Sequence, residues 1–254
     1  MQIIAVWNVK GGVGKTTTAV NLAYEAAARG FETVLWDLDP QAAATYVLKR
    51  QAGSSGSARE LVQRERKLAK LLRPTHYPRL DLIPADQSYR NIDIHLHERK
   101  KPVVQLLKIM SPLQRTHACL VLDCAPGMSL VAENVLHAAD ALVVPLIPTP
   151  LSARTLEQLI RFAGRQGRRG LELMPFFSMY DRRKRLHQDT AEALRHDYPF
   201  ILDTVVPYAA AIEQIAVRRA PLAAYSPSGP GAAMYRSLWD EIAGRLHGLG
   251  AIRG

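Results

Sequence analysis

The chain has 254 residues, 48% of them hydrophobic, and a formal charge of +10. This length and composition can bury a substantial core in one α/β domain, and no apolar run approaches the length of a membrane span. The excess positive charge indicates a polyanionic partner, nucleic acid before acidic lipid, and carries no information about the fold.

Short apolar runs alternate with longer stretches of helical periodicity. This alternation predicts a doubly wound, mostly parallel sheet with helices on both faces, and residues 1–254 are expected to form one domain. The predicted strands are 3–7, 33–36, 80–84, 118–122, 141–145, 172–177 and 202–206. The predicted helices are 16–29, 58–72, 100–110, 130–138, 153–166, 187–196 and 232–247. Several of the strands are apolar throughout, as is typical of strands covered on both faces.

Other local signals are weaker. Gly30 is well placed to end the first helix, whereas 85–99 fits neither helix nor strand clearly. We expect Gly53–Ser57 to be a flexible surface loop, and Cys119 and Cys124 to be small buried residues because their spacing suits neither a disulfide framework nor a metal site. The first strand begins within two residues of the start, which leaves no room for a signal peptide and predicts a cytoplasmic protein.

The segment Lys10–Thr17 reads KGGVGKTT and joins the first predicted strand to the first predicted helix. Its glycines allow positive φ angles and close approach to an anion, and the amides at the helix start then point at the phosphates. Lys15 would reach the terminal phosphates and the Thr16 hydroxyl would hold Mg²⁺. The residues expected to bind nucleotide here are Gly11, Gly12, Val13, Gly14, Lys15, Thr16 and Thr17.

Three carboxylates follow apolar strands. Asp37 and Asp39 come after the predicted strand 33–36, and Asp123 comes directly after the predicted strand 118–122. Ligands bind at the carboxyl ends of strands in open α/β sheets, so we expect Asp37 and Asp39 to point to one side, toward the phosphate loop. Asp123 suits the coordination of Mg²⁺ through water. A helix cap plus an exposed charge is the alternative for the first pair.

These motifs carry a family resemblance. The segment Lys10–Thr17 resembles the deviant Walker A motif of the ParA/MinD superfamily of ATPases, because a second lysine precedes the glycines and the first glycine of the strict P-loop pattern falls on Val9. Residues 37–41 resemble the family's D-x-D-P-Q switch, and 120–126 its Walker B strand and second switch. Residues 226–235 resemble the stretch before the last helix of partition ATPases. The resemblance covers nearly the whole chain and is closest to the short, Soj-like ParA type.

The resemblance implies a P-loop NTPase fold, ATP and Mg²⁺ as cofactors, and catalysis by Lys10, Lys15 and Asp39. Asp39 would orient the attacking water, while Asp37 would support the water shell of a metal held by Thr16 and Asp123. Lys10 would reach across a homodimer to the partner's nucleotide; the alternative is a free surface lysine. Pro207 is either part of the adenine pocket or simply a proline that ends a strand.

Eight basic residues gather between 161 and 185 against only Glu172 and Asp181; they are Arg161, Arg165, Arg168, Arg169, Arg182, Arg183, Lys184 and Arg185. A solvated face is the plain interpretation of such a run. The resemblance implies binding of nonspecific DNA through residues 182–185. A second family arginine is replaced within Ala209–Ala211, and Arg218 and Arg219 are candidates to compensate.

The resemblance further implies a DNA partition ATPase, driving plasmid or chromosome segregation with a ParB-like stimulating partner and associating with the nucleoid when ATP-bound. No helix-turn-helix extension precedes the loop. One alternative is the same cycle positioning a non-DNA cargo, such as a chemosensory array or an enzyme compartment. Another is a MinD-like membrane cycler, which the short, glycine-interrupted 245–254 disfavours. An iron–sulfur ATPase of the nitrogenase type is disfavoured because Cys119 lies inside a strand.

Overall fold

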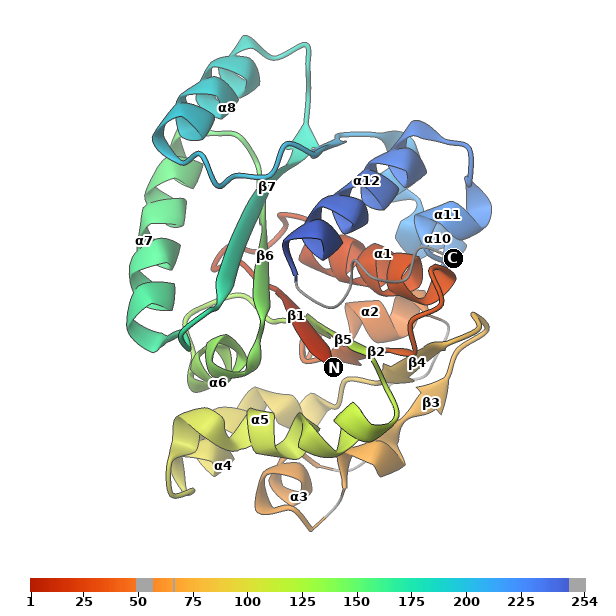
Figure 1. The fold of residues 1–254 in the computed structure, drawn as a ribbon, viewed down its shortest axis with the longest axis vertical. Helices are drawn as coiled ribbons and strands as arrows, with labels where there is room; N and C mark the ends of the chain where they lie inside the picture. Colours follow the sequence, from red (N-terminus) through yellow and green to blue (C-terminus); the bar gives the residue numbers. More distant parts are fainter. Residues whose placement is uncertain (49–56, 66, 247–254) are drawn as a thin grey trace.

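The computed structural model describes residues 1–48, 57–65 and 67–246, and within them eight strands form one sheet in the order β3-β4-β2-β5-β1-β6-β7-β8 (Figure 1). The strands are β1 Gln2–Val6, β2 Thr33–Asp37, β3 Arg73–Pro74, β4 Leu80–Ile83, β5 Cys119–Asp123, β6 Ala141–Leu146, β7 Glu172–Tyr180 and β8 Val205–Pro207. Neighbouring strands run parallel except at one edge, where β3 is antiparallel to β4. This is the predicted doubly wound α/β fold.

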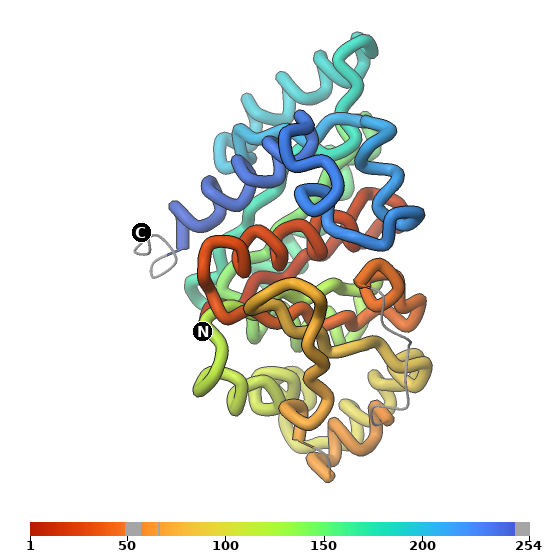
Figure 2. Tube along the Cα trace, turned by 90° about the vertical axis from the view of Figure 1, so that its right-hand side faces the viewer, coloured from red at the N-terminus to blue at the C-terminus, as the bar shows by residue number. Residues whose placement is uncertain are grey.

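Helices cover both faces of the sheet (Figure 1). They are α1 Lys15–Ala28, α2 Ala43–Val47, α3 Ala58–Gln63, α4 Ile92–His97, α5 Gln105–Met110, α6 Leu130–Ala138, α7 Pro150–Gln166, α8 Arg185–Asp197, α9 Ala210–Glu213, α10 Ile215–Arg218, α11 Leu222–Tyr225 and α12 Pro230–Arg245. Figure 2 shows α12 lying beside α1, so that the last helix packs against the first.

Strand β1 shows how the sheet divides the core. Ile3 and Ala5 pack with residues of α3 to α7, whereas Ile4 and Val6 pack with α1 and α12. Successive side chains of a strand point to opposite faces, so one apolar run can supply both layers. Four apolar residues of the last helical region pack in the second layer, as predicted, Met234 partly buried and the others buried: Met234, Leu238, Ile242 and Leu246.

Several element predictions were wrong in extent. Helix α5 begins at Gln105 rather than at residue 100, and β7 runs to Tyr180 rather than ending at 177. The helix expected over 58–72 ends at Gln63, because Arg64 adopts a left-handed conformation with φ 61° and the amide of Glu65 bonds back to the Glu60 carbonyl. A separate 3₁₀ turn, Leu68–Leu71, follows. The last strand, β8, begins at Val205, three residues later than predicted. Gly30 does end α1, with φ 91°.

Several short elements were missed. The ambiguous stretch 85–99 contains the 3₁₀ turn Gln87–Asn91 followed by α4, and α2 and α9 to α11 had no clear periodicity. Cys119 and Cys124 are buried, as predicted. The expected loop at 53–57 lies outside the described residues except for Ser57, which caps α3, and residues 247–254 also lie outside them. Among the described helices, none has the length and apolar character needed to cross a membrane.

Candidate functional site

The phosphate loop follows β1 and leads into α1. Gly12 and Gly14 have φ angles of 72° and 90°, a region in which a side chain would be strained. Val13 is buried behind the loop, and its carbonyl accepts a hydrogen bond of 2.7 Å from the Ser178 hydroxyl of β7. Helix α1 begins after Gly14 without a side-chain cap from the described residues. The amides of its first turn therefore have no side-chain acceptor among the described residues, and amides of this kind can bind an anion.

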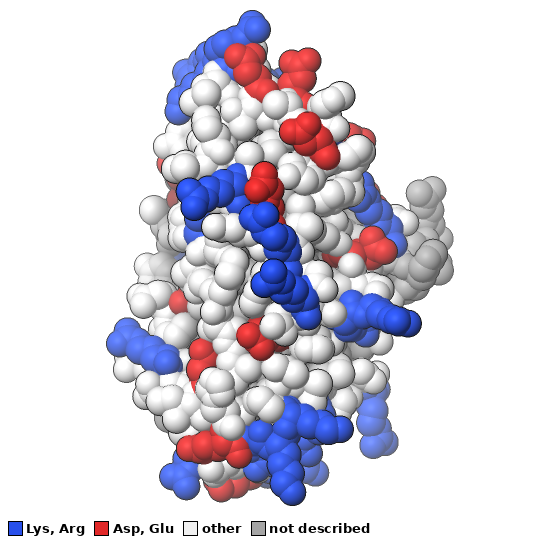
Figure 3. Space-filling view, turned by 90° about the vertical axis from the view of Figure 1, so that its left-hand side faces the viewer, with Lys and Arg blue, Asp and Glu red and all other residues white. Residues whose placement is uncertain are grey.

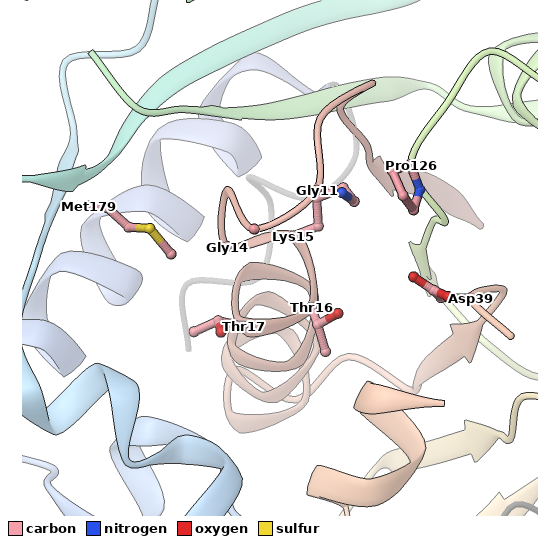
Figure 4. Close-up of a pocket in the computed structure, with 9 residues that line it drawn as sticks. Gly11, Gly14, Lys15, Thr16, Thr17, Asp39, Pro126 and Met179 are labelled. Carbon is pink, nitrogen blue, oxygen red and sulfur yellow. The ribbon is translucent and has the colours of Figure 1, made fainter. Parts of the chain in front are cut away.

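A cavity of about 320 Å³ opens over this loop (Figure 4). Its lining residues are Gly11, Gly12, Gly14, Lys15, Thr16, Thr17, Asp39, Pro126 and Met179. Met179 lies on one side of the loop and Asp39 with Pro126 on the other. Sequence reasoning missed Met179, whose φ of 51° is unusual for a residue with a side chain. Pro207, the last residue of β8, is not among the lining residues.

Lys15 is almost fully buried, with 7% of its surface exposed. Its Nζ atom donates a hydrogen bond of 2.7 Å to the carbonyl oxygen of Lys10, which holds the amine against the loop. Burial lowers the Lys15 pKa, while the nearby carboxylates of Asp123 and Asp39 act in the opposite direction. The backbone of Lys10 is fixed by a bond from its own amide to the Asn8 side chain, and its side chain forms no ion pair among the described residues.

Asp37 and Asp123 lie opposite each other on the paired strands β2 and β5. The Asp37 carboxylate accepts two hydrogen bonds from Thr45, from its amide at 2.8 Å and its hydroxyl at 2.7 Å, and a third from the Asp39 amide at 3.2 Å. Burial raises the Asp37 pKa to about 6 in spite of these bonds. Of the two switch carboxylates expected to face the phosphate loop, only Asp39 lines the cavity.

Asp123 is the unsatisfied group of the site. Both carboxylate oxygens are buried, and neither has a hydrogen-bond partner with ordinary geometry among the described residues, although the nearby Thr16 hydroxyl helps to lower the pKa. Burial, the larger effect, raises the Asp123 pKa well above its usual range. Buried carboxylate oxygens without donors are costly, and oxygen ligands are those that Mg²⁺ takes in proteins. Asp123 and Thr16 therefore fit a divalent cation.

Comparison with known proteins agrees with this site. A family model described as an AAA domain matches residues 1–169. The chromosome partitioning protein ParA of Myxococcus xanthus is 29% identical over 247 residues, covering 95% of this chain and 87% of that protein. The sporulation initiation inhibitor protein Soj of Bacillus subtilis is 28% identical, with coverage of 95% and 98%. The chain belongs to the ParA/MinD superfamily of ATPases.

A solved structure supports the same fold. The septum site-determining protein MinD of Pyrococcus horikoshii, complexed with Mg-ADP, matches with a TM-score of 0.79 and 20% identity, covering 98% of both chains. The chain is a ParA/MinD ATPase, and the MinD structure holds a nucleotide with Mg²⁺. The cavity, the buried lysine and the unpartnered Asp123 carboxylate are consistent with that nucleotide and metal.

The basic run of this ATPase is divided by β7. Arg168 and Arg169 precede the strand, whereas the residues from Arg182 onward follow it, so the two groups lie at opposite ends. Figure 3 shows Lys and Arg side chains in separate groups from the upper to the lower end of one face. All four residues of 182–185 are exposed; Arg183 pairs with Asp181 at 3.0 Å and Arg185 with Asp189 at 2.8 Å. We name residues 182–185 the arginine loop.

Arg218 and Arg219, the two candidate DNA contacts nearer the C-terminus, differ from each other. The Arg219 guanidinium lies over the Tyr46 ring, 4.4 Å from its centroid, and its Nε donates to the Tyr46 carbonyl oxygen at 3.1 Å. Arg219 is thereby bound to α2, next to Thr45, the residue that holds Asp37. Arg218 is exposed, and its Nε bonds only weakly, at 3.3 Å, to Gln214 on the same helical stretch.

Proposed function

We propose that this ATPase dimerises around ATP, binds DNA without sequence preference in that state, and positions DNA cargo such as a plasmid or chromosome. One observation carries the link between nucleotide and DNA: Met179 lines the cavity, and the arginine loop begins three residues later, at the same end of β7. The relative from Myxococcus xanthus is a chromosome partitioning protein, which supports partition as the role.

The site residues divide the proposed chemistry among them. Lys15 and the loop amides would bind the phosphates, and Thr16 with Asp123 would hold Mg²⁺, with Asp37 supporting its water shell. Magnesium supplies neutralisation of the charge that develops on the transferred phosphoryl group. Asp39, which lines the cavity, would orient the attacking water. In phosphoryl transfer such positioning and charge neutralisation account for most of the catalysis.

Dimerisation would follow from Lys10. Its side chain has no ion-pair partner among the described residues, and the loop that carries it opens toward the cavity. A ligand shifts an equilibrium only through different affinities for the two states, so a Lys10 amine that reaches a second protomer's nucleotide would favour the dimer only while the triphosphate is present. Hydrolysis would then dissolve the dimer, and a ParB-like partner would stimulate that step.

DNA contact would come from the arginine loop, joined by the exposed Arg218. Contacts to phosphate carry no sequence information, so duplexes of different sequence should bind alike. The logarithm of the binding constant should fall linearly with the logarithm of salt concentration, with a slope of about −0.9 for each phosphate neutralised. Two loops brought side by side in a dimer would roughly double that slope.

The test compares Asp39→Ala with Lys10→Ala. With saturating ATP, light scattering should find Asp39→Ala as a stable dimer, because hydrolysis is blocked, and Lys10→Ala as a monomer. In gel retardation, Asp39→Ala should retain random duplex DNA with ATP and Lys10→Ala should not. Lys67→Ala, which removes an exposed lysine of a separate turn, is the control. An Asp39→Ala chain that remains monomeric contradicts the dimer. A dimer that fails to retain DNA leaves the ATPase cycle intact and assigns it a cargo other than DNA.

A further inference from the structure

A second polar cavity lies far along the chain from the phosphate loop. It has a volume of about 390 Å³ and is formed where the end of α3, the end of α4 and the start of α5 meet. Its lining residues are Arg64, Glu98, Arg99, Lys100, Gln105 and Lys108. It shares no lining residue with the nucleotide cavity. We call it the α4–α5 cavity.

A buried glutamine organises this cavity. Gln105 is 2% exposed, and its Nε2 donates hydrogen bonds of 2.9 Å to the carbonyl oxygens of both Lys100 and Lys101. These bonds fix a turn in which Lys101 has a φ of 57°. The Gln105 Oε1 atom lies 3.5 Å from the Nη2 atom of the Arg64 guanidinium, which also lines the cavity. The fold therefore fixes Gln105 and the turn at Lys100 and Lys101.

The charge of the lining is unbalanced. Arg64, Arg99, Lys100 and Lys108 give four positive charges against the single negative charge of Glu98, a net of +3. None of these four cations forms an ion pair within the part of the chain that the structure describes, and Glu98 pairs instead with His95 at 3.8 Å. In the arginine loop, by contrast, Asp181 and Asp189 neutralise two of the four cations. Cations gathered without anions repel one another, and a bound polyanion would relieve that repulsion.

We propose that the α4–α5 cavity binds a compact polyphosphate, the chain of phosphoryl groups found in inorganic triphosphate or in a nucleoside polyphosphate. Arginine and lysine are the side chains that recognise phosphate, the first through its planar fork and the second as a point charge. A volume of about 390 Å³ is within the range of small-molecule sites, about 300–1,000 Å³. The net charge of +3 matches an anion carrying several charges.

The shape distinguishes this ligand from a nucleic acid duplex. The phosphates of a duplex follow a convex helix at regular intervals, and a protein contacts them with cations spread along its surface. Here four cations converge on one hollow instead. The lower end of the face in Figure 3 carries a dense group of Lys and Arg side chains, at the level at which Figure 1 places α4 and α5. The inference is independent of DNA binding and of the dimer.

The experiment measures binding of sodium triphosphate by calorimetry to a chain carrying Lys15→Ala, so that the phosphate loop does not compete. Triphosphate should bind this chain, and Lys108→Ala, which removes an exposed cation of the cavity, should weaken it about tenfold, the equivalent of one charge-assisted hydrogen bond. Arg99→Gln should act similarly, whereas Lys108→Arg should retain affinity. Lys70→Ala, an exposed lysine outside the cavity, is the matched control.

Three results would overturn the proposal. The first is an absence of triphosphate binding in the Lys15→Ala chain. The second is an equal loss in Lys108→Ala and Lys70→Ala, which would show that only the overall positive field attracts the anion. The third is displacement of triphosphate by random duplex DNA together with a loss of DNA affinity in Lys108→Ala, which would make the cavity part of a DNA surface.

Discussion

The nucleotide cavity and the arginine loop lie at the same end of β7 but handle charge in opposite ways. Lys15 in the cavity lining is buried, as are Asp37 and Asp123 on the neighbouring strands, and burial shifts the pKa values of all three. At the arginine loop every cation is exposed. Burial makes each charge of the cavity costly unless a specific ligand or partner compensates for it, whereas water already solvates the exposed ones. Binding at the nucleotide cavity thus depends on individual residues, whereas binding at the arginine loop depends on the number of positive charges.

Removing one buried charge should therefore have the largest effect. Lys15→Ala should weaken ATP binding by up to about a hundredfold, because a buried charge-assisted contact is worth up to about 3 kcal/mol and the loop also loses the Nζ bond to the Lys10 carbonyl. Binding of a fluorescent ATP analogue measures this loss.

A change at the arginine loop provides the contrast. Lys184→Ala also removes one lysine, an exposed one, and should leave the affinity for ATP unchanged. If Lys184→Ala weakened ATP binding as much as Lys15→Ala, charge would act through the summed field at both sites, and the difference between the two regions would disappear.

The unpartnered carboxylate predicts an effect of intermediate size. Asp123→Asn should stabilise the nucleotide-free protein at pH 8 by about 1–3 kcal/mol, because it removes a buried charge that has no donor among the described residues. Mg²⁺ with ATP should stabilise the wild type and have far less effect on the variant. Thermal denaturation with and without Mg·ATP measures both effects.

The pH dependence of that gain has a defined sign. A carboxyl whose folded pKa is raised contributes stability below its unfolded value, near 3.8, and loses that contribution as the pH rises through the folded pKa. The difference between Asp123→Asn and the wild type should therefore shrink as the pH falls from 8 toward 4. Asp37, with a pKa raised to about 6, acts in the same direction in both proteins. A gain that stayed constant with pH would mean that folding does not raise the Asp123 pKa.

The same contrast explains what the sequence could predict. Most of the strands and the Lys10–Thr17 loop were predictable because apolar runs and glycines impose their local geometry wherever they occur. The two-residue strand β3 contains no apolar run and was not predicted. The binding of Asp37 by Thr45 was not predictable, since α2 is too short for periodicity and is preceded by Ala42, whose φ is 57°. Met179 joins the cavity only because β7 extends three residues beyond its predicted end.

The positions of the basic surfaces were harder to predict from the sequence than the strands were. Eight basic residues near one another in sequence are separated by the length of β7, because a strand carries its two ends apart at about 3.3 Å per residue. The α4–α5 cavity draws its cations from three elements between 64 and 108, which are separated in the sequence and are brought together only by the fold. Proximity in sequence therefore overestimated one basic surface and missed another.

Arg218 and Arg219 extend the contrast to adjacent residues and give the smallest predicted effects. Arg218→Ala should reduce the salt-dependence slope of DNA binding by up to about 0.9 for each contacted phosphate and leave thermal stability unchanged. Arg219→Ala should instead lower stability by about 0.5–1 kcal/mol, because its guanidinium packs over Tyr46, and should leave the slope nearly unchanged. Tyr46→Leu, which keeps an apolar side chain but removes the ring, should reproduce the stability loss. If Arg219→Ala changed the slope as much as Arg218→Ala did, Arg219 would have to leave Tyr46 when DNA binds. Exposure in the nucleotide-free chain would then no longer identify the DNA contacts.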